Sequence, residues 1–166
     1  MLQKKVSMVG AFATGKTSLV ARFVKGIYSD KYQTTIGVKI DKKQVEIEDN
    51  TLNMVLLDIH GEDEFQNVRM SYLRGSAAYL LVVDGTRRAS LEVALSLKAK
   101  ISSSVGDIPF VMAINKSDLQ DQWEVLESDI ATLKGQNITV VRTSAKDDVG
   151  VEACFLQLAE KIMTGV

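Results

Sequence analysis

Cysteine is almost absent from this sequence. Cys154 is the only one among the 166 residues, so no disulfide can form within the chain. A lone thiol also fits a reducing compartment, because disulfides persist in oxidising ones. We therefore expect a cytoplasmic protein of one domain that is stabilised by a hydrophobic core, and its 46% of apolar residues are enough to build one.

Long hydrophobic runs are also absent. The longest, AAYLLVV at residues 77–83, is far shorter than the roughly 20 residues that a transmembrane helix needs. The start, MLQKK, has neither a myristoylation signal nor a signal-peptide core, and the end, EKIMTGV, has no cysteine for prenylation. We expect no membrane anchor in this chain, so membrane association would need a further tail or a partner.

The sequence has no excess of charge of either sign. Its 20 Lys and Arg residues and 21 Asp and Glu residues give a formal net charge of −1. The basic stretches are as short as QKK and DKKQ. Proteins that bind nucleic acid mainly through its phosphates carry strongly basic surfaces. We therefore do not expect nucleic acid as a partner.

What the sequence does contain is an alternation of strand-like and helical segments. Strands are predicted at 4–9, 38–48, 51–59, 77–84, 109–115 and 138–144, and helices at 17–26, 90–104, 123–135 and 151–163. The dipeptide Asp49-Asn50 predicts a hairpin turn between the second and third strands. We therefore expect an α/β fold: a six-stranded, mostly parallel sheet with one antiparallel edge strand and helices on both faces. Ligands of such sheets bind beyond the carboxyl ends of the strands.

The junction after the first strand reads GAFATGKT, residues 10–17. Backbone N–H groups at the start of a helix suit a phosphate group. Lys16 can reach the β- and γ-phosphate oxygens, and the Thr17 hydroxyl can bind Mg²⁺. An ordinary glycine-rich turn is the alternative, but the motif between a strand and a helix favours phosphate. The predicted phosphate-binding residues are Ala13, Thr14, Gly15, Lys16, Thr17 and Ser18.

The junction after the strand at 109–115 reads NKSD and can select a base. A fixed Asp118 carboxylate accepts two hydrogen bonds, from N1–H and the amino group of guanine, and adenine offers no such pair of donors. Asn115 can tie this loop to the phosphate loop, and the stem of Lys116 can pack along the base plane. A solvated turn is the alternative for so short a pattern.

The junction after the last strand reads TSAK, residues 143–146. The small side chains of Ser144 and Ala145 would let a backbone N–H group approach guanine O6, with Lys146 next in sequence. A serine near the N-cap of the last helix is an alternative that is compatible with this role.

The junction after the strand at 51–59 reads DIHG, residues 58–61, and so has the form Asp-x-x-Gly. Asp58 suits a Mg²⁺-bound water, and the N–H group of Gly61 suits a γ-phosphate. The alternative for Asp58 is an acid at a strand end that caps the next helix.

In this order and spacing, the four junctions resemble those of the Ras-like small GTPases, and the resemblance covers essentially the whole chain. YQTTIG, residues 32–37, resembles the first switch loop of that family. The resemblance implies that Thr35 binds Mg²⁺ and senses the γ-phosphate, and that Tyr28 lies against the guanine. The stretches RFVKGIYSDKYQTTIGV and DEFQNVRMSYLRGSAAYLLVVDGT are most similar to the Rab branch.

The resemblance implies the P-loop NTPase fold of small GTPases and a molecular switch that binds GTP or GDP. Mg²⁺ would be held by Thr17, Thr35 and Asp58, and Lys16, Gly61 and Glu62 would lie at the reacting phosphate. Effector and regulator proteins would bind through residues 30–40 and 60–72, and a monomer is the usual state of the family. A P-loop ATPase or kinase is a further reading, which fails if Asp118 reads guanine.

The second switch departs from the family pattern, because His60-Gly61-Glu62 replaces the usual Ala-Gly-Gln. In the family the glutamine orients the attacking water. Glu62 is charged, and two like charges at about 4 Å repel by about 4 kcal/mol at an effective dielectric near 20. We expect Glu62 to swing away from GTP or to take up a proton, with slow hydrolysis. Action of Glu62 as a general base is the opposite alternative.

Phe12 is bulky where the Ras branch usually has glycine, so we expect little response to an activating protein that inserts an arginine finger. His60 reads as a solvent-facing loop residue or as a polar group near the γ-phosphate. Together with Glu62, these residues also favour a second hypothesis: an interaction module that holds GTP or GDP without turnover. Bound-nucleotide analysis and a turnover assay separate the two hypotheses.

Overall fold

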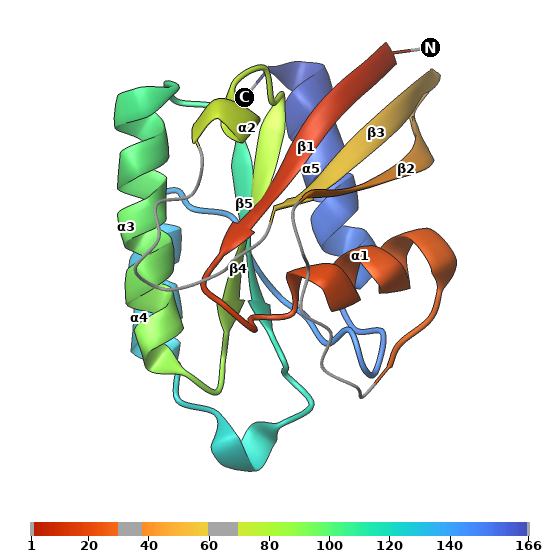
Figure 1. Cartoon of the computed structure of the whole chain (residues 1–166). Helices are drawn as coiled ribbons and strands as arrows, with labels where there is room; N and C mark the ends of the chain where they lie inside the picture. Colours follow the sequence, from red (N-terminus) through yellow and green to blue (C-terminus); the bar gives the residue numbers. More distant parts are fainter. Residues whose placement is uncertain (1, 30–37, 60–69, 166) are drawn as a thin grey trace.

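The computed structural model describes residues 2–29, 38–59 and 70–165, and six strands of the described part form one sheet (Figure 1). Their order is β2-β3-β1-β4-β5-β6. β2 pairs antiparallel with β3 at one edge, and the other neighbours are parallel. The predicted fold class is confirmed. The strands are β1 (Leu2–Gly10), β2 (Val38–Ile47), β3 (Asn50–Ile59), β4 (Ala78–Asp84), β5 (Phe110–Asn115) and β6 (Val140–Arg142).

Helices cover both faces of the sheet, as expected. α1 (Lys16–Lys25) and α5 (Val151–Thr164) lie on one face, and α3 (Arg88–Ser104) and α4 (Glu127–Gly135) lie on the other (Figure 1). A short helix, α2 (Met70–Leu73), precedes β4, and a 3-10 turn, η1 (Gln120–Gln122), follows β5. Neither short element is predicted by the sequence pattern.

Each face of the sheet has its own hydrophobic core. β4 is buried along its whole length, so its alternate side chains serve the two cores in turn: Leu80 and Val82 on one side, Tyr79 and Leu81 on the other. On the α1 and α5 side, Phe23 stacks on Phe155 with ring centroids 4.1 Å apart. Two packed faces hold the central strands rigidly in register.

Cys154, a residue of α5, is fully buried in the core. Burial raises the pKa of its thiol to about 12. The thiol therefore stays protonated at neutral pH, and the residue serves packing rather than chemistry.

The hairpin between β2 and β3 turns one residue earlier than predicted. Glu48 and Asp49 form the turn, whereas Asn50 is already in β3 and pairs with Ile47. Glu48 takes a left-handed conformation with φ 54°, a conformation that the sequence analysis did not assign to it. The prediction of a turn at Asp49-Asn50 was therefore wrong by one position, although the antiparallel pairing is correct.

The helix predicted at 123–135 begins only at Glu127. Residues 123–126 are instead held against the start of α3, because the N–H groups of Glu124 and Val125 donate to Gly85 O at 2.8 and 3.2 Å. The Asp129 carboxylate then accepts the N–H group of Leu126 at 2.9 Å and caps the helix there. Trp123, expected to open the helix, lies before it.

The register of the sheet brings the predicted junctions to one edge. Met8 of β1 lies beside Asp58 of β3, and Gly10 lies beside Val82 of β4. On the other side, Asp84 of β4 lies beside Asn115 of β5. The carboxyl ends of β1, β3, β4, β5 and β6 therefore lie at one edge of the sheet, where a ligand is expected.

Candidate nucleotide-binding site

The phosphate loop joins β1 to α1, and its two motif glycines are sterically required. A Cβ atom at Gly10 would lie 2.4 Å from the backbone oxygen of Val82. A Cβ atom at Gly15, where φ is 101°, would lie 2.2 Å from Asn115 Nδ2. These close approaches pack the loop against β4 and the end of β5.

Lys16 lies inside the loop and is 7% exposed. Its Nζ donates to Gly10 O at 3.1 Å and to Ala11 O at 2.8 Å. Burial lowers the pKa of Lys16 to about 8; Asp58 opposes this shift, and Arg87 adds to it. A buried ammonium group facing mainly carbonyl oxygens suits an anionic ligand, because a phosphate would supply the missing negative charge.

Thr17 and Asp58 meet at the start of α1. Thr17 Oγ1 donates to Asp58 Oδ2 at 2.5 Å, and Asp58 is 1% exposed. Its other oxygen, Oδ1, is buried and has no hydrogen-bond partner among the described residues. Burial raises the pKa of Asp58, whereas the hydrogen bond from Thr17 and the charge of Lys16 act in the opposite direction. A hydroxyl and an unsatisfied buried carboxylate oxygen fit Mg²⁺, which prefers oxygen ligands.

Asn115 joins the phosphate loop to the two loops that are predicted to read the base. Its Nδ2 donates to Thr14 O at 3.1 Å, and its Oδ1 accepts the Thr143 hydroxyl at 3.0 Å. Thr143 O in turn accepts the N–H group of Ser117 at 3.0 Å. One buried amide therefore fixes the spacing between the phosphate-binding and base-binding ends of the site.

The carboxylate of Asp118 is held in place by Ser144. Ser144 Oγ donates to Asp118 Oδ1 at 2.7 Å and accepts the N–H group of Asp147 at 3.0 Å. The loop after β5 and the loop after β6 are thus locked to each other. A carboxylate fixed in this way is suited to read a pair of donors, such as those of guanine.

Lys116 spans the site rather than pointing into solvent. Its Nζ donates to Ala13 O at 3.0 Å and forms an ion pair with Asp84 Oδ2 at 2.9 Å. Its backbone is left-handed, with φ 71°, which places its stem across the loop. The contact with Asp84 is a link that the sequence analysis missed.

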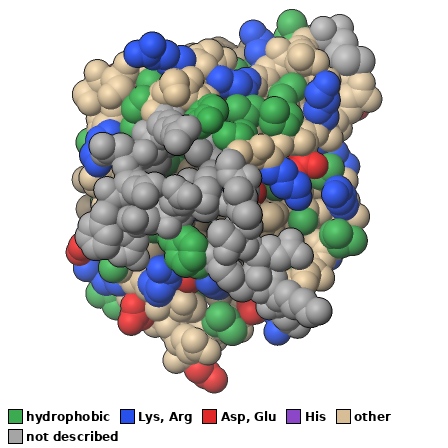
Figure 2. Space-filling view, in the orientation of Figure 1, with side chains coloured by type: hydrophobic (Ala, Val, Ile, Leu, Met, Phe, Trp, Pro, Cys, Tyr) green, Lys and Arg blue, Asp and Glu red, His purple; other side chains and the backbone are tan. Residues whose placement is uncertain are grey.

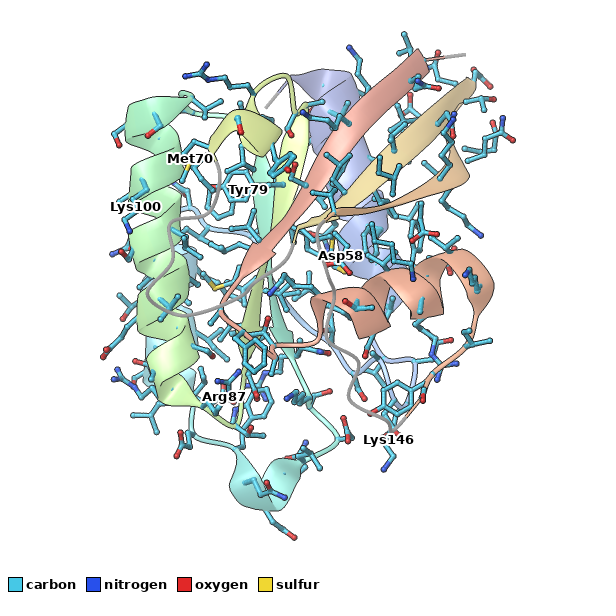
Figure 3. All side chains as sticks on the ribbon, in the orientation of Figure 1. Asp58, Met70, Tyr79, Arg87, Lys100 and Lys146 are labelled. Carbon is cyan, nitrogen blue, oxygen red and sulfur yellow. The ribbon has the colours of Figure 1, made fainter. Side chains whose placement is uncertain are left out.

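Two arginines that the sequence analysis missed also hold the loops. Arg22 of α1 donates through Nε to Ala145 O at 2.8 Å and through Nη2 to Lys146 O at 2.9 Å. Arg87, at the start of α3, donates to Phe12 O at 2.5 Å and to Asp84 Oδ2 at 3.0 Å. Figure 3 shows Arg87 and Lys146 at the same edge of the molecule, beyond the strand ends. For Arg87, the sequence offers one signal: Asp84, an acidic residue at the end of the buried strand β4.

Several predicted residues lie outside the described part of the chain. Thr35, Gly61 and Glu62 belong to this group, as do His60 and the greater part of the predicted partner-binding loops, 30–40 and 60–72. Tyr28 is described and is 38% exposed after α1. Ser18 is the third residue of α1 and is partly buried.

The surface around the site carries charges of both signs. On the face seen in Figure 2, the described Lys, Arg, Asp and Glu side chains are scattered among apolar and polar ones. This distribution agrees with the net charge of −1. Among the described helices, none combines the length and the hydrophobicity needed to cross a membrane.

Comparison with known proteins finds a family match and relatives over almost the whole chain. The Ras family model matches residues 5–164. RabJ of Dictyostelium discoideum is 30% identical over 98% of this chain, which covers 64% of that protein, slightly under two thirds. Mouse Rab-19 is 30% identical over 96% of this chain and 75% of its own length. Bovine Rab-7b is 31% identical over 96% of this chain and 82% of its own length.

Proposed function

This chain belongs to the Ras family, whose members are GTP-binding switches and GTPases, and we propose that it hydrolyses GTP slowly with Mg²⁺ in one GTP-binding domain. The observation that carries the proposal is the chain of contacts from Thr14 through Asn115 to Thr143. It sets the phosphate loop and the base-reading loops at a fixed separation, as a nucleotide requires.

The base is read by Asp118. Its carboxylate, oriented by Ser144, accepts hydrogen bonds from N1–H and the amino group of guanine. Ala145 and Lys146, held by Arg22, form the wall beside the base, and Tyr28 covers its other side. The stem of Lys116 lies along the base plane.

The phosphates are bound by the backbone of residues 13–18 and by the ammonium group of Lys16. Thr17, Thr35 and, through a water, Asp58 would hold Mg²⁺. The ion, when bound, neutralises the charge that develops on the phosphate oxygens. Gly61 donates its N–H group to the γ-phosphate. The buried Asp58 oxygen, which has no hydrogen-bond partner in the described part of the chain, supports this assignment.

Hydrolysis is slow because Glu62 replaces the amide that orients the attacking water in the family. A carboxylate beside the γ-phosphate is repelled by it, and cannot donate a hydrogen bond unless protonated. Phe12 adds bulk where an activating protein would insert an arginine. GTP therefore persists on the protein until a partner acts, and the output passes through residues 30–40 and 60–72.

The experiment that tests the nucleotide assignment compares GDP with xanthosine diphosphate. Wild type should prefer GDP, and Asp118→Asn should shift the preference toward the xanthine nucleotide, whose C2 carbonyl needs a donor. We expect the ratio of the two dissociation constants to change by about a hundredfold or more. Asp121→Asn, which changes an exposed acid three residues beyond Asp118, is the matched control and should leave the ratio unchanged. An unchanged ratio for Asp118→Asn contradicts the assignment.

A second candidate is an interaction module that holds guanine nucleotide without turnover. Glu62, His60 and Phe12 favour it, since all three depart from the family pattern. Nucleotide released from the purified protein, followed by a turnover assay with GTP and Mg²⁺, separates the two functions. Bound nucleotide without phosphate release supports the module.

The partners are regulator and effector proteins that distinguish the GTP-bound from the GDP-bound state. We propose a cytoplasmic monomer that reaches membranes through a further tail or a partner. A charge-reversing substitution at Lys39, which lies in the described part of residues 30–40, tests the output. Unchanged binding of every GTP-dependent partner contradicts it.

A further inference from the structure

We propose that Arg87 is a positioning residue for nucleotide phosphates: with Asp84 it fixes the Phe12 peptide, so that the phosphate loop presents its N–H groups to the ligand. This inference deepens the proposed function and rests on its assignment of phosphate to residues 13–18. It concerns a side chain that lies outside the four junction motifs of the sequence analysis.

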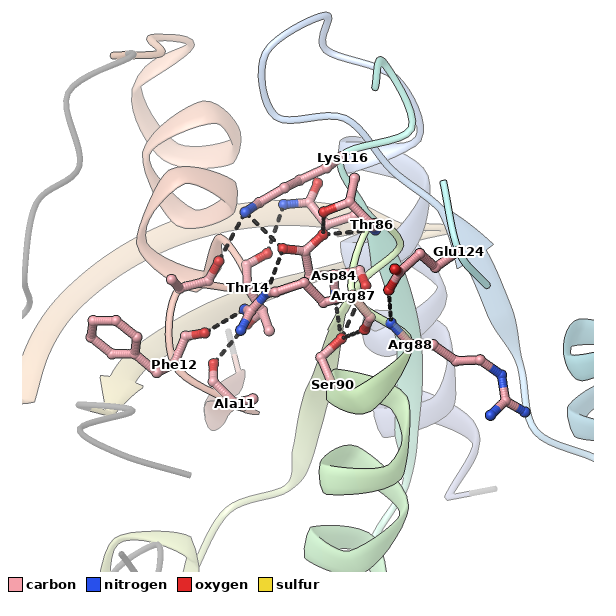
Figure 4. Close-up of polar contacts among 12 residues, drawn as sticks. Ala11, Phe12, Thr14, Asp84, Thr86, Arg87, Arg88, Ser90, Lys116 and Glu124 are labelled. Atoms are coloured by element: carbon pink, nitrogen blue, oxygen red, sulfur yellow. Dashed lines mark hydrogen bonds and ion pairs between the residues drawn. The ribbon is translucent and has the colours of Figure 1, made fainter. Parts of the chain in front are cut away.

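Asp84 is the centre of the cluster (Figure 4). It ends β4, is 1% exposed, and accepts four hydrogen bonds from side chains and backbone. Thr86 donates its N–H and hydroxyl to Oδ1 at 2.9 and 2.6 Å, whereas Arg87 Nε and Lys116 Nζ share Oδ2 at 3.0 and 2.9 Å. Two cations are therefore anchored on one buried carboxylate oxygen.

The two anchored cations reach neighbouring carbonyl groups of the phosphate loop. Arg87 Nη2 donates to Phe12 O at 2.5 Å, and Lys116 Nζ donates to Ala13 O at 3.0 Å. Asn115 Nδ2 holds the next carbonyl, Thr14 O, at 3.1 Å. Three consecutive carbonyl groups are thus each held by a different side chain, and these side chains come from two other loops.

Holding these carbonyl groups decides where the N–H groups point. In a planar trans peptide, the C=O and N–H bonds point in opposite directions. Fixing Phe12 O, Ala13 O and Thr14 O therefore turns the N–H groups of Ala13, Thr14 and Gly15 to the opposite side. Among the described residues, these three N–H groups have no acceptor. Successive N–H groups turned to one side form an anion-binding concavity.

Arginine is the residue type that this position requires. Its guanidinium offers several donors in a rigid plane, so Nε can bind Asp84 while Nη2 binds Phe12 O. A lysine has one nitrogen and cannot keep the same separation between the two acceptors. Without the anchor on Asp84, a flexible side chain would hold the Phe12 carbonyl less firmly, and the first N–H group of the concavity would lose its orientation.

The neighbouring arginine provides a matched comparison. Arg88 follows directly in sequence, but its guanidinium pairs with Asp129 at 2.8 Å and Glu92 at 3.6 Å, both on helices. Its side chain is more exposed than that of Arg87, 48% against 37%. Removing Arg88 takes away the same charge from the same helix start without touching the phosphate loop.

The test measures dissociation of fluorescently labelled GDP and competition by GMP, which offers the base and one phosphate but no β-phosphate. Arg87→Gln should speed GDP dissociation about tenfold, as the loss of a charge-assisted hydrogen bond allows, and change the GMP dissociation constant less than about twofold. Arg87→Lys should lie between wild type and Arg87→Gln, and Arg88→Gln should match wild type. Melting curves of each variant establish that it is folded, and Arg87→Lys decides the question if Arg87→Gln does not fold.

Four outcomes overturn the inference. GDP dissociation from Arg87→Gln at the wild-type rate removes the positioning role. Equal weakening of GDP and GMP, or an equal effect of Arg88→Gln, makes Arg87 a general stabilising residue instead. Wild-type protein that binds no GDP overturns the proposed function and this inference with it, whereas wild-type binding with an inert Arg87 overturns only the inference.

Discussion

The residues that define this site are charged groups that the fold removes from water. Lys16, Asp58 and Asp84 are all buried at the carboxyl edge of the sheet. Burial alone would neutralise each of them, so each depends on partners. Lys16 and Asp58 have incomplete partners and are suited to a phosphate and a cation, whereas Asp84 is fully hydrogen-bonded and braces the loops.

Asp84 should make stability depend on pH. Burial would raise its pKa, but the hydrogen bonds from Lys116, Thr86 and Arg87 outweigh burial and hold the pKa below its ordinary value. The unfolded chain, with an Asp pKa of about 3.9, therefore takes up the proton first as pH falls, and this stability is lost below about pH 4. Asp84→Asn should lower the free energy of unfolding by about 3 kcal/mol at pH 7.

Urea unfolding of wild type and Asp84→Asn between pH 3 and 7 measures this effect. The difference between the two proteins should shrink as pH falls through the window. Asp121→Asn removes an exposed acid on the surface and serves as the control, with a much smaller effect at every pH. A constant difference for Asp84→Asn across the range contradicts the role given to its charge.

The sequence predicts only part of the site at this scale, and the reason is physical. Lys16, Thr17, Asn115 and Asp118 stand at fixed spacings within short motifs, so the sequence alone places them. Arg87 and Arg22 instead bind backbone carbonyl groups 75 and 123 residues away in sequence. Every residue has a backbone carbonyl group, so no pattern of residue types predicts such a contact.

At the scale of elements, the site depends on how the connection after β5 docks on the start of α3. Gly85 accepts the N–H groups of Glu124 and Val125, and the ring of Trp123 lies over it. A Cβ atom at Gly85 would lie 2.0 Å from a ring carbon of Trp123. Gly85 lies between Asp84 and Thr86, so this packing supports the acid that braces the phosphate loop.

Gly85→Ala should displace Trp123. We expect a loss of about 1–3 kcal/mol in unfolding free energy, since the ring must move to admit a methyl group. Trp123 is the only tryptophan, so its emission should shift to longer wavelength as the ring becomes exposed. Unfolding curves and fluorescence spectra measure both effects.

Gly135→Ala is the control for that substitution. Gly135 lies in α4 with open space where its Cβ atom would be, so alanine should stabilise the protein by about 0.5–1 kcal/mol. An unchanged emission spectrum and unchanged stability for Gly85→Ala would show that Trp123 does not depend on this glycine.

The elements themselves follow the sequence more closely than their ends do. Buried strands such as β4 are visible from composition alone. The start of α4 is not, because hydrogen bonds to Gly85 hold residues 123–126 in a non-helical path. The position of the β2–β3 turn differs from the prediction for a similar reason. Asn50 pairs with Ile47 within the sheet, and this pairing outweighs the turn preference of Asp49-Asn50.

At the scale of the whole molecule, the sheet positions the binding loops at its carboxyl edge. Ligand binding to those loops should therefore stabilise the entire fold. At a GDP concentration a hundred times its dissociation constant, linkage gives about 2.7 kcal/mol. This should raise the melting temperature by about 5–10 °C, whereas ADP should raise it little.

Removal of Mg²⁺ should weaken that stabilisation. A chelator removes the Mg²⁺ ion, whose positive charge offsets the repulsion between Asp58 and the phosphates. The melting temperature with GDP should therefore fall toward that of the free protein. Thermal melts with GDP, with ADP, and with GDP plus chelator make the comparison. Equal stabilisation by ADP would contradict guanine recognition, and indifference to the chelator would contradict the Mg²⁺ assignment.

The most direct test of a slow GTPase switch is single-turnover hydrolysis of pre-bound GTP with Mg²⁺, comparing wild type with Glu62→Gln. We predict that wild type hydrolyses GTP slowly and that the variant, whose amide can orient water without repelling the γ-phosphate, is faster. A wild type faster than Glu62→Gln would contradict the account, because the carboxylate would then take part in catalysis.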